Sequence, residues 1–520
     1  MNRNNGINRL NKTEEWDVIV IGGGASGLGA GVEACTRGYK TVLFEQHDFS
    51  KGTSSRSTKL VHGGVRYLAQ GDISLVLEAL KERGLLRQNA PHLVSNQAFI
   101  IPNYEWWSGP FYTVGLKVYD LMSGKLGLGP SEHITTEEVL ETIPNLKKKG
   151  LMGGIIYYDG QFDDSRLAIN LAQTMNDNAG VPINYMKVIG LLKNGNNLIE
   201  GVRVRDEETR EEYEVHAKVV VNATGVFADG ISKMDNEQAK TSIVPSQGVH
   251  IVLDKRFLKG DSAIMIPKTS DGRVLFAVPW HNKVVVGTTD TLIEEISLEP
   301  RALKEEIDFI LKTAKKYLDF PPTKKDVLSV FAGLRPLAAP ENPGEETKEV
   351  SRNHKITVSL SGLVAIVGGK WTTYRKMGQD VIEKAIIMGG LKESKSVTEN
   401  MPIHGYVKNF DRNDHLHYYG SEAIDIKEMI RKDVSLGAKI IDEYPYVKAQ
   451  VIWAVRNEMA RTVEDFLARR IRLLFLDARA SRKAAPVVAR LMAGELKKDK
   501  KWISGQLEAY KSLATEYILE

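Results

Sequence analysis

Apolar positions recur with a changing period along the first part of the chain. A short apolar run over Asp17–Ile21 predicts a buried strand, and helical spacing over Leu28–Arg37 predicts a helix that ends at Gly38. A second apolar run over Thr41–Glu45 predicts another strand. These elements together predict one strand–helix–strand unit of the kind that builds a parallel sheet.

The pattern then becomes mixed. Residues 50–67 are rich in Ser, Thr and Gly and predict an ordered loop, whereas residues 95–150 predict an irregular, aromatic-rich segment. Helical spacing returns over Ile73–Gln88 and Asp164–Asn178. Strand patterns are predicted at Ala217–Val221, Gly248–Leu253, Arg273–Val278, Lys283–Thr288, Lys355–Leu360 and Leu363–Val367.

This order of elements predicts three domains in an α/β (α+β) fold. A nucleotide-binding domain is interrupted by a strand-rich substrate or cap domain, and a charged, helical region follows after about residue 395. The predicted boundaries are 15–88, 151–235 and 355–395 for the first domain, 89–150 and 236–354 for the second, and 396–520 for the C-terminal helical domain.

Composition narrows the class of protein. The 520 residues are 42% hydrophobic and carry a net charge of only +4, which does not indicate nucleic-acid binding and fits an anionic substrate or a membrane surface. The single cysteine, Cys35, allows no intramolecular disulfide. The polar N-terminus lacks the apolar core of a signal peptide, and no apolar run approaches the roughly 18 residues of a spanning helix. We therefore expect a cytoplasmic protein, free or attached to the inner face of the cell membrane.

The pattern Gly22-x-Gly24-x-x-Gly27 lies between the first predicted strand and helix. The first glycine allows a tight turn, the second lets the backbone approach a pyrophosphate, and the third lets the helix pack against the strand. Glu45 follows at close to the usual spacing of about 20 residues and is expected to bind ribose hydroxyls. The small residues that end the strand Val219–Gly225, and the absence of a second such glycine pattern, favour FAD over NAD.

Further motifs occur at Thr53–Tyr67, Val221–Gly225, Gln247–His250, Pro279–Trp280, Val286–Asp290, Gly333–Pro336 and Gly368–Arg375. Together they make the sequence similar to the FAD-dependent (aerobic, respiratory) glycerol-3-phosphate dehydrogenases. The resemblance covers most of residues 15–390 and, more weakly, the helical C-terminal part. One residue departs from the expected pattern: Trp371 replaces a smaller aliphatic residue, which should change packing more than chemistry.

The resemblance implies a p-hydroxybenzoate-hydroxylase-like FAD-binding Rossmann domain with an interleaved antiparallel-sheet substrate domain. It also implies oxidation of sn-glycerol 3-phosphate to dihydroxyacetone phosphate, with electrons passed to a membrane quinone. A large insertion of the kind typical of related oxygen-using oxidases is absent, which favours a dehydrogenase. The oligomeric state stays open, and a homodimer is one option.

Such a reaction needs an anion clamp, a base and a charge stabiliser. Arginine binds a phosphate dianion with two donors at once, and the resemblance implies this role for Arg335 and Arg352. His250 is the leading candidate for the base, because a neutral imidazole suits proton abstraction near neutral pH.

Three more residues are candidates at the same site. Arg66 and Lys370 each follow glycines, where the backbone can approach a flavin, and either could stabilise a developing alkoxide or reduced flavin. Lys370 could serve as the base only if burial lowered its pKa. Tyr67 is predicted either to contact the substrate or to pack in the core.

The loop Thr53–Gly63 is expected to wrap the flavin and its ribityl chain, with His62 as a flavin neighbour. No motif indicates covalent flavin, and no His/Cys cluster indicates a metal site. The full set of predicted cofactor-binding residues is Gly22, Gly23, Gly24, Ala25, Ser26, Gly27, Glu45, Gln46, Thr53, Ser54, Ser55, Thr58, Lys59, Leu60, His62, Gly63, Ala223, Thr224, Gly225, Gly333, Gly369, Lys370 and Thr372.

Two stretches are candidates for contact with an anionic membrane surface. The first is the aromatic segment Tyr104–Tyr112. The second is a basic helix, capped by Thr462 and Asp465, whose apolar face could instead be core and whose charges could instead be a solvated face. That apolar face is Val463, Phe466, Leu467, Ile471 and Leu474. The basic residues are Arg461, Arg469, Arg470, Arg472, Arg479, Arg482 and Lys483.

Three alternatives remain at this stage. A glycerol-3-phosphate oxidase that uses oxygen shares most of these features. An amino-acid oxidase of the same flavin superfamily shares the glycine motif, but its carboxylate substrate needs only one principal arginine. A flavin-binding scaffold or sensor without turnover would not need the concentrated candidates Arg66, His250, Arg335 and Lys370.

Overall fold

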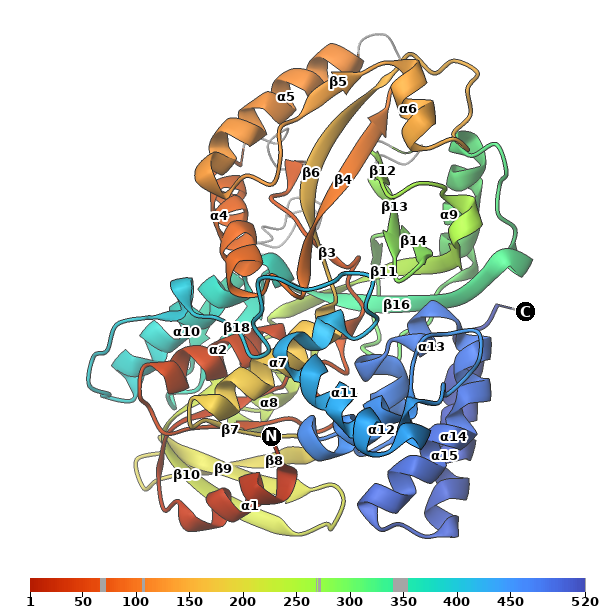
Figure 1. The fold of residues 1–520 in the computed structure, drawn as a ribbon. Coiled ribbons are helices and arrows are strands. Elements are labelled where there is room, and N and C mark those ends of the chain that lie inside the picture. The colour runs from red at the N-terminus through yellow and green to blue at the C-terminus, as the bar shows by residue number, and fades with distance from the viewer. Residues whose placement is uncertain (66–71, 105–107, 268, 270–272, 340–353, 520) are drawn as a thin grey trace.

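The computed structural model describes residues 1–65, 72–104, 108–267, 269, 273–339 and 354–519. The described elements form two sheets and a group of C-terminal helices. In the view of Figure 1 the antiparallel sheet stands above the parallel sheet, and the last helices lie beside both. Helix α1 (Arg3–Lys12) precedes the first strand and packs on the edge strand β7.

The first sheet is built around β1, whose residues Val18–Ile21 are all buried because helices or strands cover both faces. Its strand order is β17-β18-β10-β1-β2-β7, with β1 parallel to both β2 and β10. An antiparallel ribbon of β8 (Met186–Lys193) and β9 (Ile199–Asp206) extends from β10. The six strands are β1 (Trp16–Ile21), β2 (Thr41–Phe44), β7 (Val181–Ile183), β10 (Glu212–Asn222), β17 (His354–Val358) and β18 (Val364–Gly368).

Helix α2 (Ala25–Thr36) packs against both α7 (Asp164–Asp177) and α10 (Tyr374–Met388) beside this sheet. Helix α2 starts three residues before the predicted position, because Gly24 forms its N-cap. Helices α2 and α10 cross closely where each carries a glycine. A Cβ atom added to Gly378 would lie 2.5 Å from the carbonyl of Gly29, so any side chain there would push the helices apart.

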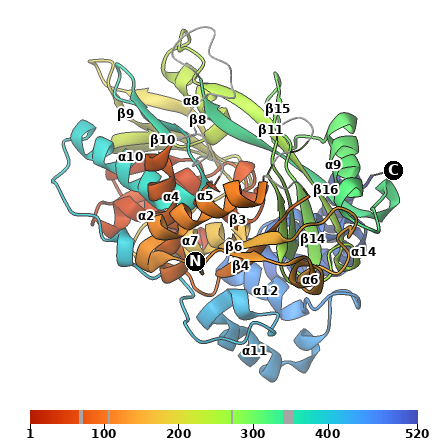
Figure 2. The same ribbon diagram turned by 90° about the horizontal axis from the view of Figure 1, so that it is seen from above.

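The second sheet is mostly antiparallel, in the order β15-β11-β14-β13-β12-β4-β6-β3, with β16 on β11 and β5 on β6. Helices α4 (Ile73–Asn89), α5 (Ser108–Ser123), α6 (Thr136–Thr142) and α9 (Lys304–Tyr317) surround it, as Figures 1 and 2 show. Its strands are β3 (Leu60–Val61), β4 (Val94–Pro102), β5 (Glu132–Ile134), β6 (Gly154–Phe162), β11 (Ile243–Asp254), β12 (Ala263–Ile266), β13 (Leu275–Trp280), β14 (Lys283–Gly287), β15 (Thr291–Leu292) and β16 (Val327–Ala338).

The prediction of irregular structure over residues 95–150 is wrong. This segment contains most of β4 and all of α5, β5 and α6. The apolar run Phe99–Ile101 is buried without alternation, and β4 pairs along its whole length with β6, about 60 residues later. Neither property produces a local strand signal, because the partner strand supplies both the hydrogen bonds and the cover.

The C-terminal region is helical, as predicted. Its helices are α11 (Ala423–Lys432), α12 (Lys448–Asn457), α13 (Leu473–Leu476), α14 (Ala478–Leu496) and α15 (Lys500–Thr515), with a π-helical turn at Asp465–Arg470. The predicted cap is present, since the Asp465 backbone N–H donates to Thr462 Oγ1 at 3.2 Å. It opens this π-helical turn and not an α-helix.

Three of the seven basic residues proposed to meet lipid are buried instead, whereas Arg479, Arg482 and Lys483 are exposed. Arg469, Arg470 and Arg472 are at most 3% exposed and form ion pairs with buried carboxylates. The apolar face of the same segment is core, because every one of its predicted residues is buried. None of the helices within the described ranges is long and apolar enough to cross a membrane.

Candidate active site

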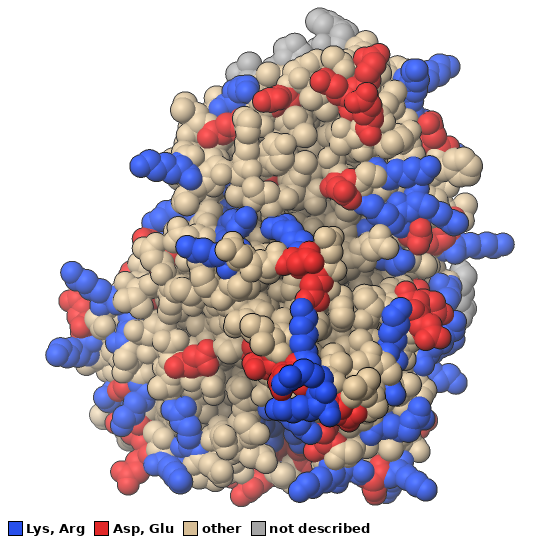
Figure 3. Space-filling model, in the orientation of Figure 1, with Lys and Arg blue, Asp and Glu red and all other residues tan. Residues whose placement is uncertain are grey.

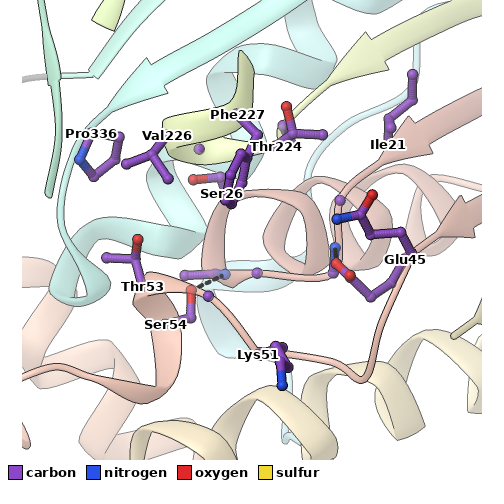
Figure 4. Close-up of a pocket in the computed structure, with 18 of the residues that line it drawn as sticks. Ile21, Ser26, Glu45, Lys51, Thr53, Ser54, Thr224, Val226, Phe227 and Pro336 are labelled. Carbon is purple, nitrogen blue, oxygen red and sulfur yellow. Dashed lines mark hydrogen bonds between the residues drawn. The ribbon is translucent and has the colours of Figure 1, made fainter. Parts of the chain in front are cut away.

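The glycine turn lies between β1 and α2 and closes tightly on itself. Gly22 has φ +110°, which favours glycine, and a Cβ atom at Gly27 would lie 1.9 Å from the Gly22 carbonyl oxygen. The N–H of Ala25, in the first turn of α2, donates to Ser54 Oγ at 2.9 Å, as Figure 4 shows. The turn leads into the start of α2, where backbone N–H groups and the positive end of the helix dipole suit phosphate.

Glu45 follows β2, contacts the glycine turn directly and lines the same cavity of about 310 Å³ (Figure 4). Its carboxylate accepts hydrogen bonds from the backbone N–H of Gly23 at 2.7 Å and of His47 at 2.8 Å. Burial raises the pKa of Glu45, while these two N–H groups oppose the rise. Backbone donors thus hold the carboxylate in one orientation at this end of the cavity.

Most of the predicted cofactor residues line this cavity. They come from the glycine turn, the end of β2, the loop after it, the end of β10 and the turn after β18. The predicted residues that line it are Gly22, Gly23, Gly24, Ala25, Ser26, Glu45, Gln46, Thr53, Ser54, Ala223, Thr224, Gly225, Gly369 and Lys370. Small and glycine residues dominate one side, so the lining leaves room for a long, flat ligand.

A second cavity, of about 220 Å³, shares the lining residues Thr53, Pro336 and Gly368–Trp371 with the first. It brings together His250 from β11, Arg335 from β16 and Lys370 from the turn after β18. Predicted cofactor residues that line it are Thr53, Thr58, Leu60, His62, Gly333, Gly369, Lys370 and Thr372. Residues more than 300 positions apart in the sequence thus surround one space next to the first cavity.

His250 is held in a defined orientation at this cavity. Its Nε2 atom lies 3.0 Å from Thr58 Oγ1, and its ring stacks on Phe331 with the ring centres 5.0 Å apart. Burial lowers the pKa of His250 well below its usual value, and the charges of Lys59 and Arg335 lower it further. The imidazole is therefore neutral at neutral pH and is able to accept a proton.

Arg335 points from β16 toward the end of β14. It donates to Thr288 Oγ1 at 2.8 Å and to the Thr289 carbonyl at 2.9 Å, and it lies 3.3 Å from an Asp290 carboxylate oxygen. Several partners therefore fix the direction of the guanidinium. Thr288, Thr289 and Asp290 belong to the Val286–Asp290 motif and follow an apolar strand directly. This motif is the feature of the sequence from which their place at the site could have been predicted.

A third cavity, of about 190 Å³, continues from the second through Thr58, Leu60, His62, Phe276 and Arg335. Sequence reasoning missed several polar residues that line it, namely Asp159, Arg273, Thr288, Thr289 and Asp290. Arg273 begins an expected strand but falls just before the observed β13, and no motif pointed to it. The third cavity thus adds a second arginine to the surroundings of Arg335.

Some predicted residues are not brought to these cavities. Lys59 is fully buried, with its ammonium 2.6 Å from Asp164 and 2.7 Å from the Ser55 carbonyl. Gly63 packs on Leu80 and donates its N–H to the Tyr119 hydroxyl at 2.9 Å. Gly27 packs against the Gly22 carbonyl of the glycine turn. The Ser55 hydroxyl donates to the Gly52 carbonyl within the loop. Arg66, Tyr67 and Arg352 lie outside the described residues.

Trp371 does more than alter packing. Its indole N–H donates to the Ser54 carbonyl at 2.9 Å, and its ring packs edge-on against Phe162 and Tyr374. It lines both the first and the second cavity. The departure from the family pattern therefore lies on the wall of the site and fixes the loop that carries Ser54.

These features fit an adenine dinucleotide of the length of FAD. The turn at Gly22 and the start of α2 offer donors for a pyrophosphate, Glu45 offers a carboxylate for ribose, and two adjoining cavities continue toward His250. Among the residues that the structure describes, no group of His, Cys, Asp and Glu is arranged to hold a metal ion.

Comparison with known proteins agrees with this geometry. Residues 17–375 match the family "FAD dependent oxidoreductase", and residues 364–502 match the "C-terminal domain of alpha-glycerophosphate oxidase". The mitochondrial glycerol-3-phosphate dehydrogenase of Homo sapiens is 39% identical over 96% of this chain and 73% of its own length. The corresponding enzyme of Arabidopsis thaliana is 39% identical over 94% of this chain and 84% of its own length.

Solved structures show the same fold. The glycerol-3-phosphate dehydrogenase of Bacillus halodurans, complexed with FAD, matches with a TM-score of 0.80 and 27% identity over 99% of this chain and 98% of that one. The L-alpha-glycerophosphate oxidase of Mycoplasma pneumoniae matches with a TM-score of 0.57 and 17% identity over 75% of this chain and 98% of that one, a likeness of fold alone. The predicted fold class and the predicted cofactor, FAD, are confirmed.

Proposed function

Because this chain belongs to the FAD-dependent glycerol-3-phosphate dehydrogenases, we propose that it oxidises sn-glycerol 3-phosphate to dihydroxyacetone phosphate. The observation that supports this most directly is the second cavity, where a neutral histidine and two cationic side chains, Arg335 and Lys370, surround one space beside the dinucleotide cavity. FAD, when bound, supplies the hydride acceptor for such a reaction.

His250 takes the base role in this proposal. Its imidazole would accept the proton of the substrate hydroxyl, and stacking on Phe331 and the contact with Thr58 fix the ring for that transfer. Burial keeps the imidazole neutral and therefore ready to accept the proton.

Arg335 takes the phosphate role, because its guanidinium is fixed in direction and faces both the second and the third cavity. Lys370 would stabilise the developing alkoxide. The resemblance adds Arg66, Arg352 and Tyr67 to the substrate site. Bound substrate would lie between these cations, shielded from bulk water by the two sheets.

The chain's own residues would hold FAD along the first two cavities. The glycine turn would bind the pyrophosphate, Glu45 the ribose hydroxyls, and the loop Thr53–Gly63 the flavin end. In this proposal the predicted boundaries divide the chain into an FAD domain, a substrate domain and a C-terminal helical domain of residues 396–520.

We further propose that the electrons pass to a membrane quinone, with the protein attached to the inner face of the cell membrane. The family resemblance supports this, and the candidates for membrane contact are the aromatic segment 104–112 and the exposed basic residues Arg479, Arg482 and Lys483. Tyr104 itself packs inward, since its hydroxyl donates to the Lys147 carbonyl at 2.7 Å. Residues 105–107 lie outside the described part of the chain.

Anaerobic reduction of the flavin tests the substrate. We expect glycerol 3-phosphate to bleach the flavin absorbance of the purified protein, and glycerol and L-amino acids to leave it unchanged at equal concentration. Glycerol is the matched control for the phosphate group, and amino acids test the related oxidases. Bleaching by amino acids alone would overturn the assignment, and bleaching by no donor would favour a scaffold without turnover.

An oxygen-using oxidase is the second candidate, because residues 364–502 match the C-terminal domain of alpha-glycerophosphate oxidase. The two activities differ in what reoxidises the flavin. We expect slow peroxide release in air and fast turnover with a soluble quinone analogue. Peroxide formed at the same rate as substrate oxidation, with no stimulation by quinone, would favour the oxidase.

A further inference from the structure

The loop of residues 45–59, here called the cofactor loop, lies between the cavities and the C-terminal helical region. One side lines the first and second cavities through residues such as Glu45, Thr53 and Thr58. The other side is bound by side chains from the C-terminal helical region. These side chains, here called the clasp, are Glu464, Arg469, Arg470, Arg472 and Tyr517.

Asp48 is the first point of contact. Arg469 Nε lies 2.6 Å from one of its carboxylate oxygens, and Arg470 donates to both oxygens at 2.7 and 3.0 Å. All three side chains are at most 3% exposed. Burial alone would raise the pKa of Asp48, but the two guanidinium charges outweigh burial and lower it. Separating this cluster would leave buried charges without partners, which costs far more than an exposed ion pair.

Lys51 is the second point of contact. Its ammonium lies 2.5 and 2.6 Å from the two carboxylate oxygens of Glu464, and Lys51 is also one of the residues that line the first cavity. Arg469 also contacts Glu464, at 2.6 Å, so the first and second contacts form one network. Figure 4 shows Lys51 on the cofactor loop, opposite the glycine turn.

Arg56 is the third point of contact. It donates to the loop carbonyls of Lys51 and Gly52, and its other terminal nitrogen lies 2.5 Å from Glu299 and 3.1 Å from the Tyr517 hydroxyl. Tyr517 in turn donates to Glu299 at 3.0 Å. The Tyr517 carbonyl accepts from Val330 N–H on β16, which anchors the tyrosine independently of its hydroxyl.

Arg472 adds a fourth contact, since it donates to the Ser55 carbonyl at 2.7 Å and to Asp164 at 2.9 Å. The four contacts are distributed along the loop at positions 48, 51, 55 and 56. None of the five clasp residues lines any of the three cavities, although Lys51 and Arg56, which they contact, do. The loop is therefore held against the cavities by a part of the chain that itself lines none of the three.

We propose that the C-terminal helical region is a clasp that holds the cofactor loop closed over bound FAD, with Glu464 and Tyr517 as positioning residues. FAD can leave only when the loop moves, and loop movement must break buried ion pairs and hydrogen bonds of the clasp. Weakening the clasp therefore speeds FAD release without altering any residue that lines the cavities. Tyr517 lies beyond the region matched to the C-terminal family, residues 364–502. The proposal concerns FAD retention and does not depend on which substrate is oxidised.

The rate of FAD release tests the clasp, measured as the rise in flavin fluorescence after dilution of the holoenzyme into buffer without FAD. Tyr517→Phe removes one hydroxyl, and Tyr510→Phe is its control, because the Tyr510 hydroxyl forms a hydrogen bond with Ser481 inside the C-terminal helical region. Glu464→Gln removes one carboxylate charge, and Glu495→Gln is its control, because Glu495 pairs with Arg456 far from the loop. Glu464 and Glu495 are equally exposed, at 21% and 20%.

We expect FAD release to become about three- to tenfold faster in Tyr517→Phe, because one hydrogen bond is lost. Release should become at least tenfold faster in Glu464→Gln, because one buried charge is lost. Both controls should stay within about twofold of the parent. Equal release rates in each variant and its control would overturn the clasp. A general loss of stability is separated by the melting temperature of the FAD-free protein: release rates that simply follow the fall in melting temperature across variants and controls alike would overturn the clasp.

A double-variant cycle tests the Arg56–Glu299–Tyr517 triad directly. Because Tyr517 and Glu299 act through the same Arg56 side chain, the combined Tyr517→Phe and Glu299→Gln variant should release FAD no faster than the faster single variant. Release rates that multiply in the double variant would show independent effects and would contradict the triad.

Discussion

At the scale of single residues, His250 and Lys59 lie against the same aromatic side chain. The His250 ring stacks on Phe331, and the Lys59 ammonium lies 5.2 Å from the centre of the Phe331 ring. Burial lowers the pKa of Lys59 to about 7, while Asp164 opposes that shift. A buried cation near a histidine disfavours the imidazolium, so the fold itself keeps His250 in the form that a base requires.

Replacing His250 by Ala should lower the limiting rate of anaerobic flavin reduction by glycerol 3-phosphate about 10²- to 10⁴-fold. Because the pKa of His250 is well below its usual value, the parent rate should stay constant as pH falls to about 6.5 and decline only below it. Stopped-flow absorbance measures both.

Arg335→Ala is the contrasting variant. It should mainly raise the substrate concentration needed for half-maximal reduction, because the phosphate loses its partner while the base is intact. If the limiting rate of His250→Ala equalled that of the parent, His250 would not be the base.

Residues that lie in recognisable motifs could be predicted from the sequence. Residues whose role depends on which way the side chain points could not. His250, Arg335 and Lys370 were predicted from separate motifs, and the structure brings them to one cavity. Lys59 belongs to the same polar loop as Thr58, yet its side chain turns to Asp164. Neighbouring residues in an irregular loop have no fixed period, so the sequence does not indicate which of them face the cofactor.

At the scale of elements, the glycine turn is the most strongly constrained part of the site. Gly27→Ala should push α2 away from β1, because the new Cβ would lie 1.9 Å from the Gly22 carbonyl oxygen. We expect a loss of about 1–3 kcal/mol in the free energy of unfolding and lower FAD occupancy of the purified protein. Chemical denaturation and the flavin-to-protein absorbance ratio measure these two effects.

Gly494→Ala is the matched control for that substitution. Gly494 lies within α14, where an added Cβ meets no atom within 4 Å, so alanine should leave stability unchanged or raise it slightly. If Gly27→Ala retained full stability and FAD content, the tight packing of α2 on the turn would not matter for the site.

Elements with a strong local pattern were predicted to within a few residues, as for β1, α2 and β2. The π-helical turn at Asp465–Arg470 was not, because its geometry follows from long-range ion pairs. From sequence alone, a run of arginines beside apolar residues looks like a charged face. Its carboxylate partners come from positions such as Asp48, more than 400 residues away.

At the scale of the whole molecule, the segment between the parallel sheet and the C-terminal helices is anchored by His404. Its Nδ1 atom lies 2.6 Å from Asp177 at the end of α7, and its Nε2 atom lies 2.9 Å from Glu422. Burial alone would lower the pKa of His404, but the two carboxylates outweigh it and raise the pKa to about 9. The anchor is therefore an ion pair at neutral pH.

The contribution of His404 to stability should depend on pH with a predictable sign. A pKa raised from about 6.5 to about 9 on folding gives stability that is fully present below pH 6.5 and lost as pH rises through 9. The melting temperature of His404→Gln should thus lie below that of the parent at pH 6 and approach it at pH 10. His216→Gln, at an exposed strand position, should match the parent throughout. A difference independent of pH would contradict the ion-pair role.

Basic and acidic side chains are interspersed over the face drawn in Figure 3, in agreement with a net charge of only +4. Composition was therefore informative about surface charge. It could not indicate how the three parts of the chain meet, because those contacts join residues far apart in the sequence and have no local period.

The contacts of the cofactor loop also set an order of events during protein synthesis. The ribosome makes residues 45–59 early and Tyr517 near the end of this sequence, and at about 5–20 residues per second the interval is roughly 20–90 s. During that interval the nascent chain has its glycine turn and its loop but not the side chains that hold the loop in place. Stable loading with FAD is therefore a step that follows translation, and a chain truncated within its last helices would leave the ribosome with a pocket that cannot close.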